Sequence, residues 1–197
     1  YSLTTKNEVL GFALVTARPR PQLTRGVREV AVGPDGTLFT VDDSLRVVQY
    51  VRRNPQRFDA KLPARPRELY GTRNANLLAV SSGQGSVLTV LRPDDQPGKI
   101  ALPAGDAAST FWGDLVAIAA DSAVVLVEPE HPDRKRSIPV DGHARAVIFS
   151  PSGHRFYVAQ REGPVLVYNR FTREQMDEID LPGAAASLRA DPFGRWL

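Results

Sequence analysis

Short runs of alternating apolar and polar residues follow one another along most of the chain. The runs are rich in β-branched and aromatic residues and end at Gly, Pro, Asn or Asp, which is typical of antiparallel β-strands. The best helical candidate is Phe171–Glu178, but the repeat described next predicts a turn and an outer strand there. The pattern therefore predicts an all-β protein.

Turn sequences recur at a nearly constant distance along the chain. They end at residues 36, 76, 114, 153 and 194, with spacings of 40, 38, 39 and 41 residues. Each turn follows one apolar run and precedes a second; in the complete repeats a third and a fourth run follow, and the fourth is the most polar. Four antiparallel strands in about 40 residues, repeated, are typical of the blades of a β-propeller, whereas an all-β sandwich does not need a fixed period.

The repeat assigns the whole chain, residues 1–197, to a single β-propeller region with blades of about 39 residues. Residues 1–25 are expected to form a part-blade of three outer strands (Tyr1–Thr5, Val9–Val15 and Pro21–Thr24), and residues 183–197 a complementary part-blade with the inner strand Ala185–Ala190. Four complete blades are expected at residues 26–65, 66–104, 105–142 and 143–182. We interpret these five blades' worth of sequence as part of a larger propeller with attached domains outside this chain. The alternative is a five-bladed ring closed by its two ends.

Two stretches resemble the blades of known propellers. Gly142-His143, Ser150–Gly153 and Tyr168-Asn169 take the places of the Gly-His, Ser-Pro-Asp-Gly and Trp-Asp sequences of WD-repeat or YVTN-type blades. Val30–Gly36 resembles the same pattern, and the remaining blades lack both Gly-His and Trp-Asp. This resemblance implies a propeller fold, and the YVTN type implies a place in the bacterial cell envelope or periplasm. The chain also resembles propeller regions that precede a peptidoglycan-binding sporulation-related repeat (SPOR) domain, of which it contains no residue.

Composition excludes several classes of protein. The chain has 197 residues, 42% hydrophobic and 24% charged, values that exclude collagen, coiled coil and disorder. It has no cysteine, so disulfides and Cys-ligated zinc are excluded. Its longest apolar runs, Leu115–Ala120 and Ala123–Val127, are too short to span a membrane. The net charge of +3 is not gathered in a basic arm, so we expect no nucleic-acid partner.

Arginine recurs where the chain enters the predicted inner strands. Arg67 and Arg145 follow Arg28 by 39 and 117 residues, which is one and three repeats, and Arg25 and Arg65 lie close to the first two. In a propeller these positions surround one mouth of the central channel, where clustered guanidinium groups bind carboxylates or phosphates. The alternative is that each arginine pairs with an acidic residue of the neighbouring blade. Those acidic residues are Glu29, Glu68 and Asp106.

Acidic residues in the loops between second and third strands are weak metal candidates. They are Asp42, Asp121 and Glu162. Aspartate also favours tight turns for conformational reasons alone, so we assign no metal site, no cofactor and no catalytic residue. His143 is expected to anchor a turn by hydrogen bonding within its blade.

These observations predict a non-catalytic interaction or scaffold module. Its loop face and channel mouth would bind a protein, peptide or glycan, including anionic ones. The alternative is a propeller enzyme (a hydrolase, a lyase or a quinoprotein) with a site at the channel mouth. No nucleophile elbow, P-loop or His-Glu-x-x-His sequence is present to support it.

Overall fold

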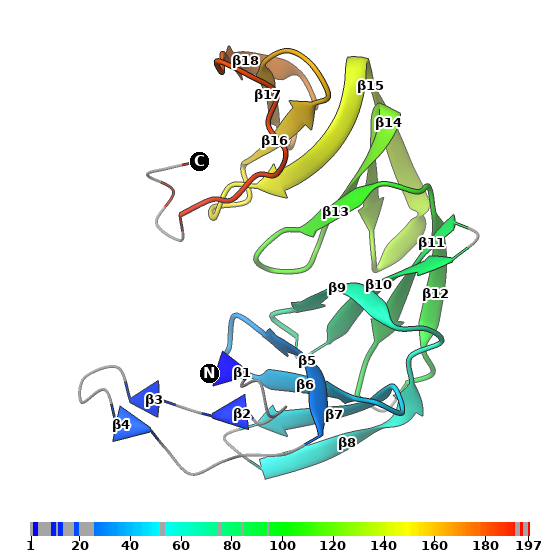
Figure 1. Ribbon diagram of the computed structural model, residues 1–197. Helices are drawn as coiled ribbons and strands as arrows, with labels where there is room; N and C mark the ends of the chain where they lie inside the picture. Colours follow the sequence, from blue (N-terminus) through cyan, green and yellow to red (C-terminus); the bar gives the residue numbers. More distant parts are fainter. Residues whose placement is uncertain are drawn as a thin grey trace. The chain divides into compact units, whose positions relative to one another are not determined.

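A computed structural model describes residues 2–3, 9–10, 12–13, 18–19, 26–51, 54–74, 76–83, 85–93, 95–191, 194 and 197. Within these residues the protein consists of β-strands, turns and loops without a helix, which confirms the all-β prediction (Figure 1). The chain divides into two compact units. Unit 1 comprises Tyr1–Ser81 and Thr89–Gly98, and unit 2 comprises Ser82–Leu88 and Lys99–Leu197.

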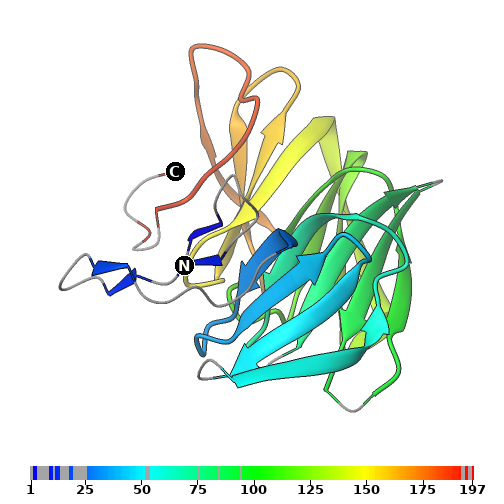
Figure 2. The same cartoon turned by 60° about the horizontal axis from the view of Figure 1, so that its bottom comes forward.

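Unit 1 contains a four-stranded antiparallel meander in the order β5-β6-β7-β8. Its strands are β5 (Val27–Val32), β6 (Leu38–Asp42), β7 (Arg46–Val51) and β8 (Asn54–Lys61). The twist between neighbouring strands of this sheet is visible in Figure 2. The sheet follows the predicted four-strand repeat, because tight turns join consecutive strands that pair with each other.

Two small strand pairs precede this sheet. They are β1 (Ser2–Leu3) with β2 (Val9–Leu10), and β3 (Phe12–Ala13) with β4 (Arg18–Pro19). The predicted strand Pro21–Thr24 and Arg25 lie outside the described residues.

A second four-stranded meander has the order β9-β10-β11-β12. It is formed by β9 (Pro66–Gly71), β10 (Leu77–Gly83), β11 (Gly85–Leu91) and β12 (Gly98–Leu102), and the division between the two units passes through it. Within unit 1, β9 lies against β5. The core of unit 1 joins Phe39, Val41 and Val47 to Leu77 and Leu91, all of them at most 1% exposed.

Unit 2 contains a six-stranded antiparallel sheet in the order β13-β14-β15-β16-β17-β18. The strands are β13 (Asp106–Ser109), β14 (Val116–Glu128), β15 (His131–Phe149), β16 (Arg155–Gln160), β17 (Val165–Asn169) and β18 (Gln175–Ile179). Strand β15 runs through the position where a blade boundary was expected, at 142–143.

Strand β14 covers two predicted strands and the Asp121-Ser122 turn expected between them. Residues 116–119 pair with β13, whereas residues 123–128 pair with β15. Asp121 has a positive φ of 51° at the point of change, and the register shifts between Asp121 and Ala123. A local irregularity of this kind redirects a strand without ending its pairing.

Side chains on both faces of β16 and β17 are buried. Phe156 is 0% exposed and stacks on Tyr168, with ring centroids 5.0 Å apart and planes inclined by 6°. On the other face, Ala159 and Val165 contact Leu188, which is 8% exposed. The predicted strand Ala185–Ala190 therefore packs against the sheet through Leu188, but it does not form a hydrogen-bonded β-strand. No described strand pairs with it, and backbone groups form a strand only with a paired neighbour.

The recurring turns share one backbone geometry. Gly36, Gly113, Gly153 and Gly194 have φ values of 79°, 75°, 70° and 70°. Each donates its N–H to the carbonyl oxygen three residues earlier, at 2.8–3.0 Å. A tight turn that ends in a left-handed residue is a common connection between antiparallel strands and favours glycine. This geometry confirms four of the five predicted turns; the fifth is closed by Thr72, whose Oγ1 accepts the Asn76 N–H at 3.2 Å.

Candidate functional site

A cavity of about 370 Å³ lies in unit 2 beside the turns that connect its strands. One side is formed by β14, β15 and the short turn between them, and the other side by the turns that follow β13 and β17. The lining side chains are Asp114, Leu115, Leu126, Glu128, Glu130, His131, Arg134, Arg136, Arg170, Phe171 and Arg173.

The β14–β15 side is a tight hairpin. Glu128 pairs directly with His131, and Leu126 lies opposite Arg136 in the register. Side chains of a strand alternate between its two faces, so Arg134 and Arg136 point to the same face of β15. Arg134 forms a long ion pair with Glu128, with 3.9 Å between Nη1 and Oε2.

The β17–β18 side is a turn shaped by Asn169. Its Oδ1 accepts the backbone N–H groups of Phe171 at 2.8 Å and Thr172 at 3.1 Å. Its carbonyl oxygen accepts the N–H of Arg173, which has a positive φ of 65°. Asparagine stabilises such turns by replacing a backbone acceptor with its side chain. The turn thereby presents Arg170, Phe171 and Arg173 toward the cavity.

An ion pair joins this turn to the turn after β13. Arg170 Nη2 donates to Asp114 Oδ2, and Thr110 Oγ1 donates to Asp114 Oδ1 at 2.5 Å. Partial burial alone would raise the pKa of Asp114, but the hydrogen bonds from Thr110 and Arg170 outweigh it and lower the pKa. Asp114 is therefore ionised at neutral pH and holds the two turns together.

The cavity lining carries one net positive charge. Four arginines face three carboxylates, with His131 counted as neutral. Arg170 and Arg134 have carboxylate partners, whereas among the described residues the guanidinium group of Arg136 donates only to the Lys135 carbonyl oxygen, at 3.4 Å. The side chain of Arg173 makes no hydrogen bond or ion pair within the described part of the chain. Two guanidinium groups are thus available for an anionic ligand.

Exposed aromatic side chains surround the same turns. Phe171 is 62% exposed, with the Arg170 guanidinium 5.2 Å from its ring centroid. Phe111 and Trp112, in the turn after β13, are 53% and 42% exposed, and their ring centroids lie 4.7 Å apart. We call Phe111, Trp112, Phe171 and the adjoining cavity the aromatic end of unit 2. Aromatic residues and arginine are the types that dominate binding energy at protein interfaces.

The arginines predicted from the repeat have other surroundings. Arg28 donates to Asp43, which lowers the pKa of Asp43 and raises that of Arg28. Arg65 pairs with Glu29, with 3.3 Å between Nη2 and Oε1. This second pair is of the kind expected under the alternative prediction, in which an arginine pairs with an acidic residue of the neighbouring blade. Here the arginine that pairs with Glu29 is Arg65. Both pairs border a small cavity of about 60 Å³ in unit 1.

The remaining predicted arginines belong to different units of the chain or lie outside the described residues. Arg67 is exposed on β9 in unit 1, and Arg145 is exposed on β15 in unit 2. Arg25 lies outside the described residues. A ring of arginines around one channel mouth therefore stays a prediction.

The first metal candidate, Asp42, closes a turn. Its Oδ1 accepts the backbone N–H groups of Ser44 at 2.8 Å and Arg46 at 3.0 Å. These bonds explain an aspartate at this position without a ligand.

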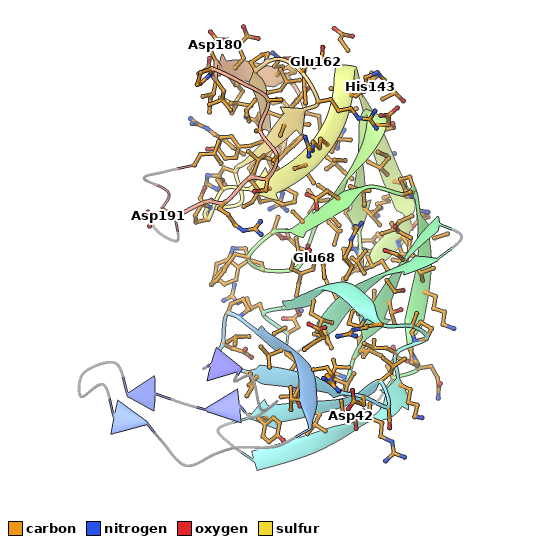
Figure 3. All side chains as sticks on the ribbon, viewed as in Figure 1. Asp42, Glu68, His143, Glu162, Asp180 and Asp191 are labelled. Carbon is orange, nitrogen blue, oxygen red and sulfur yellow. The ribbon has the colours of Figure 1, made fainter. Side chains whose placement is uncertain are left out.

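The other metal candidates lie in unit 2, where Figure 3 shows His143 and Glu162 at the same end of the strands. Asp121 Oδ1 lies 3.0 Å from His143 Nδ1 and 3.6 Å from Arg161 Nη2. His143 thus hydrogen-bonds to Asp121 of the neighbouring strand, which belongs to the preceding predicted blade (105–142) and not to the blade expected for His143 (143–182). Among the described residues, no three His, Asp or Glu side chains are grouped closely enough to hold a metal ion.

Sequence reasoning overlooked the aromatic end, although one signal for it was present. Arg134 and Arg173 are 39 residues apart, which is the repeat length, and each lies between a predicted third and fourth strand. Arg28 and Arg67 show the same spacing at the entrance to the predicted first strands.

Comparisons with known proteins bear on the fold only. No protein-family model and no curated protein matches the chain. A chain in the crystal structure of a nidogen/laminin complex is 13% identical, with a TM-score of 0.57, over 93% of this chain and 79% of that one. A chain of Kuenenia stuttgartiensis hydrazine synthase is 15% identical, with a TM-score of 0.47. That match covers 86% of this chain and 40% of the hydrazine synthase chain.

Both solved structures are distant, and at such identities a likeness indicates a fold without an activity. Within the described residues, no helix is long and apolar enough to cross a membrane.

Proposed function

We propose that the protein is a non-catalytic interaction module of the β-propeller type that binds a protein or peptide at the aromatic end of unit 2. The propeller arrangement is supported by the 39-residue period and by the consecutive antiparallel strands of each sheet. Within each unit, the first strand of one repeat also lies against the first strand of the next, β5 against β9 and β13 against β15. The nidogen neighbour is itself a β-propeller.

The observation that carries the binding proposal is the exposure of three aromatic side chains beside an arginine-lined cavity. Phe111, Trp112 and Phe171 together leave a large apolar area in water, and covering it with a partner is favourable by about 25 cal/mol per Å². The turns that carry them are fixed by the Asp114–Arg170 pair. Side chains that are already held in place lose less entropy on binding.

A peptide fits this end better than a neutral glycan does. The lining combines arginines, carboxylates and an aromatic ring, which complement the charged and apolar side chains of a polypeptide. The nidogen neighbour was solved together with laminin, so a related fold engages a protein in that case. The envelope or periplasmic location implied by the YVTN resemblance is kept as part of this proposal.

A selection with displayed random peptides tests the proposal. Peptides enriched on the wild-type protein are measured by fluorescence anisotropy against a Trp112→Ala/Phe171→Ala double variant. The matched control is Leu181→Ala, which removes an exposed apolar side chain (43%) beyond the far end of β18. Truncating two central contacts costs at least about 2 kcal/mol, so we expect affinity to fall more than tenfold for the double variant only. Absence of enriched peptides, or equal binding by the double variant, contradicts the proposal.

A further inference from the structure

We infer that the cavity of the aromatic end recognises an acidic side chain of the bound peptide, held by Arg136 and Arg173. The inference rests on the proposed function and specifies the chemistry of its ligand: an aspartate or glutamate next to an apolar residue.

The two guanidinium groups come from opposite sides of the cavity. Arg136 extends from β15, and Arg173 comes from the turn that Asn169 shapes. Neither has a carboxylate partner among the described residues, although three carboxylates line the same cavity. Two of those, Asp114 and Glu128, are paired with Arg170 and Arg134. A ligand carboxylate would therefore find donors that the protein itself leaves available.

The charge of the lining selects a singly charged anion. One net positive charge is neutralised by one carboxylate, whereas a phosphate or sulfate group of two charges would be repelled by Asp114, Glu128 and Glu130.

Apolar side chains in the cavity lining explain why we expect an apolar residue next to the acidic residue of the peptide. Leu115 is 7% exposed and Leu126 is 2% exposed, and the ring of Phe171 stands beside them at 62%. A volume of about 370 Å³ lies at the lower end of the range of ligand pockets, which is enough for two side chains of a peptide. An aliphatic residue next to the acidic one would mainly cover the exposed ring of Phe171, because both leucines are already almost fully buried.

Two peptide libraries test the inference, both acetylated and amidated so that a chain terminus supplies no charge. One contains a central Asp or Glu and the other contains Asn or Gln instead. Selected peptides are titrated against wild type, Arg136→Gln/Arg173→Gln and Arg161→Gln. Arg161 is the matched control, because it is an exposed arginine of the same unit, directly after β16, and lies outside the cavity. Thermal unfolding checks that each variant folds.

We expect the acidic library to yield binding peptides. Their affinity should fall at least tenfold when the central Glu of the peptide is replaced by Gln, and by the same factor when wild-type protein is replaced by the Arg136→Gln/Arg173→Gln variant. Arg161→Gln should bind as wild type does, and inorganic phosphate should displace the peptide no better than acetate. The inference fails if the neutral library gives equal binders, if the double variant is unaffected, if Arg161→Gln loses as much, or if phosphate competes tenfold better. If the selected peptides lose affinity only for the Trp112→Ala/Phe171→Ala variant, the proposed function is supported and this inference is wrong. If neither library yields a binding peptide, both the proposed function and this inference are wrong.

Discussion

The pair formed by Asp114 and Arg170 joins two turns of the candidate site, and removing it tests how that site is built. We consider Asp114→Asn, Arg170→Gln and the double variant, analysed as a double-mutant cycle. Asn and Gln keep the approximate shape of each side chain and remove the ionic interaction. The side chain of Arg170 is 18% exposed and that of Asp114 is 47% exposed.

These exposures set the expected coupling energy. A fully exposed ion pair contributes roughly 0–1 kcal/mol, and a hydrogen bond to a charged group contributes about 1.5–3 kcal/mol when shielded. Because only Arg170 is well shielded, we expect a coupling of about 1 kcal/mol, screened in part by solvent on the Asp114 side. Arg173→Gln combined with Asp114→Asn is the control, since Arg173 lies in the same turn without contacting Asp114, and its coupling should be near zero.

Urea unfolding at several pH values provides the measurement. The folded-state pKa of Asp114 is lowered from an ordinary value of 3.8, so the pair stabilises the fold fully above that value. The stabilisation is lost as the pH falls below 3.8 through the lowered pKa, because both folded and unfolded carboxyl groups are then protonated. The reasoning is refuted if the coupling at pH 7 is below about 0.3 kcal/mol, within the usual error of additivity. It is also refuted if the same coupling persists after acidification.

Two further predictions concern the recurring turn and the core of unit 2. Gly153→Ala should lower the free energy of unfolding by about 1 kcal/mol, because Gly153 has a φ of 70°. The control is Gly183→Ala, at a site with open space, which should change the free energy of unfolding little. Equal melting temperatures of the two variants would contradict this prediction. Phe156→Ala should cost about 3–5 kcal/mol in urea unfolding, since the ring is fully buried and stacked on Tyr168. A loss below about 1 kcal/mol would show that the core closes around the missing ring.

The strands and turns were predictable because their causes are local. The alternation of side chains depends on neighbouring residues in the chain, and so do the tight turns, four of which contain a left-handed glycine such as Gly36 or Gly153. The continuity of β14 was not predictable, because Asp121 can either end a strand or redirect it. The unpaired segment around Leu188 could not be anticipated either, since its sequence favours a strand but pairing depends on a neighbour far away in the chain.

The candidate site was harder to predict for a reason of the same kind. An arginine acts as a ligand-binding group only if no carboxylate of the fold neutralises it, and its partner is set by tertiary structure. Arg28 pairs with Asp43 in the loop between β6 and β7, and Arg65 pairs with Glu29, 36 residues earlier in the chain. Nothing in the sequence around Arg28 distinguishes it from Arg136 or Arg173.

The repeat helps to distinguish arginines that bind a ligand from arginines that form ion pairs within the fold. Positions shared by most repeats serve the fold, as the turn glycines do, whereas a residue type confined to consecutive repeats marks something local to them. Arg134 and Arg173 occupy one repeat position, and the preceding repeats carry Asp95 and Gln56 there. Because side chains at one repeat position come to the same end of their sheets, an arginine present only in the last two repeats concentrates positive charge at that end of unit 2. The repeat spacing of the arginines therefore indicates at which end of the strands a binding site lies. The ion pairs with carboxylates at that end then determine which arginines are available to bind a ligand.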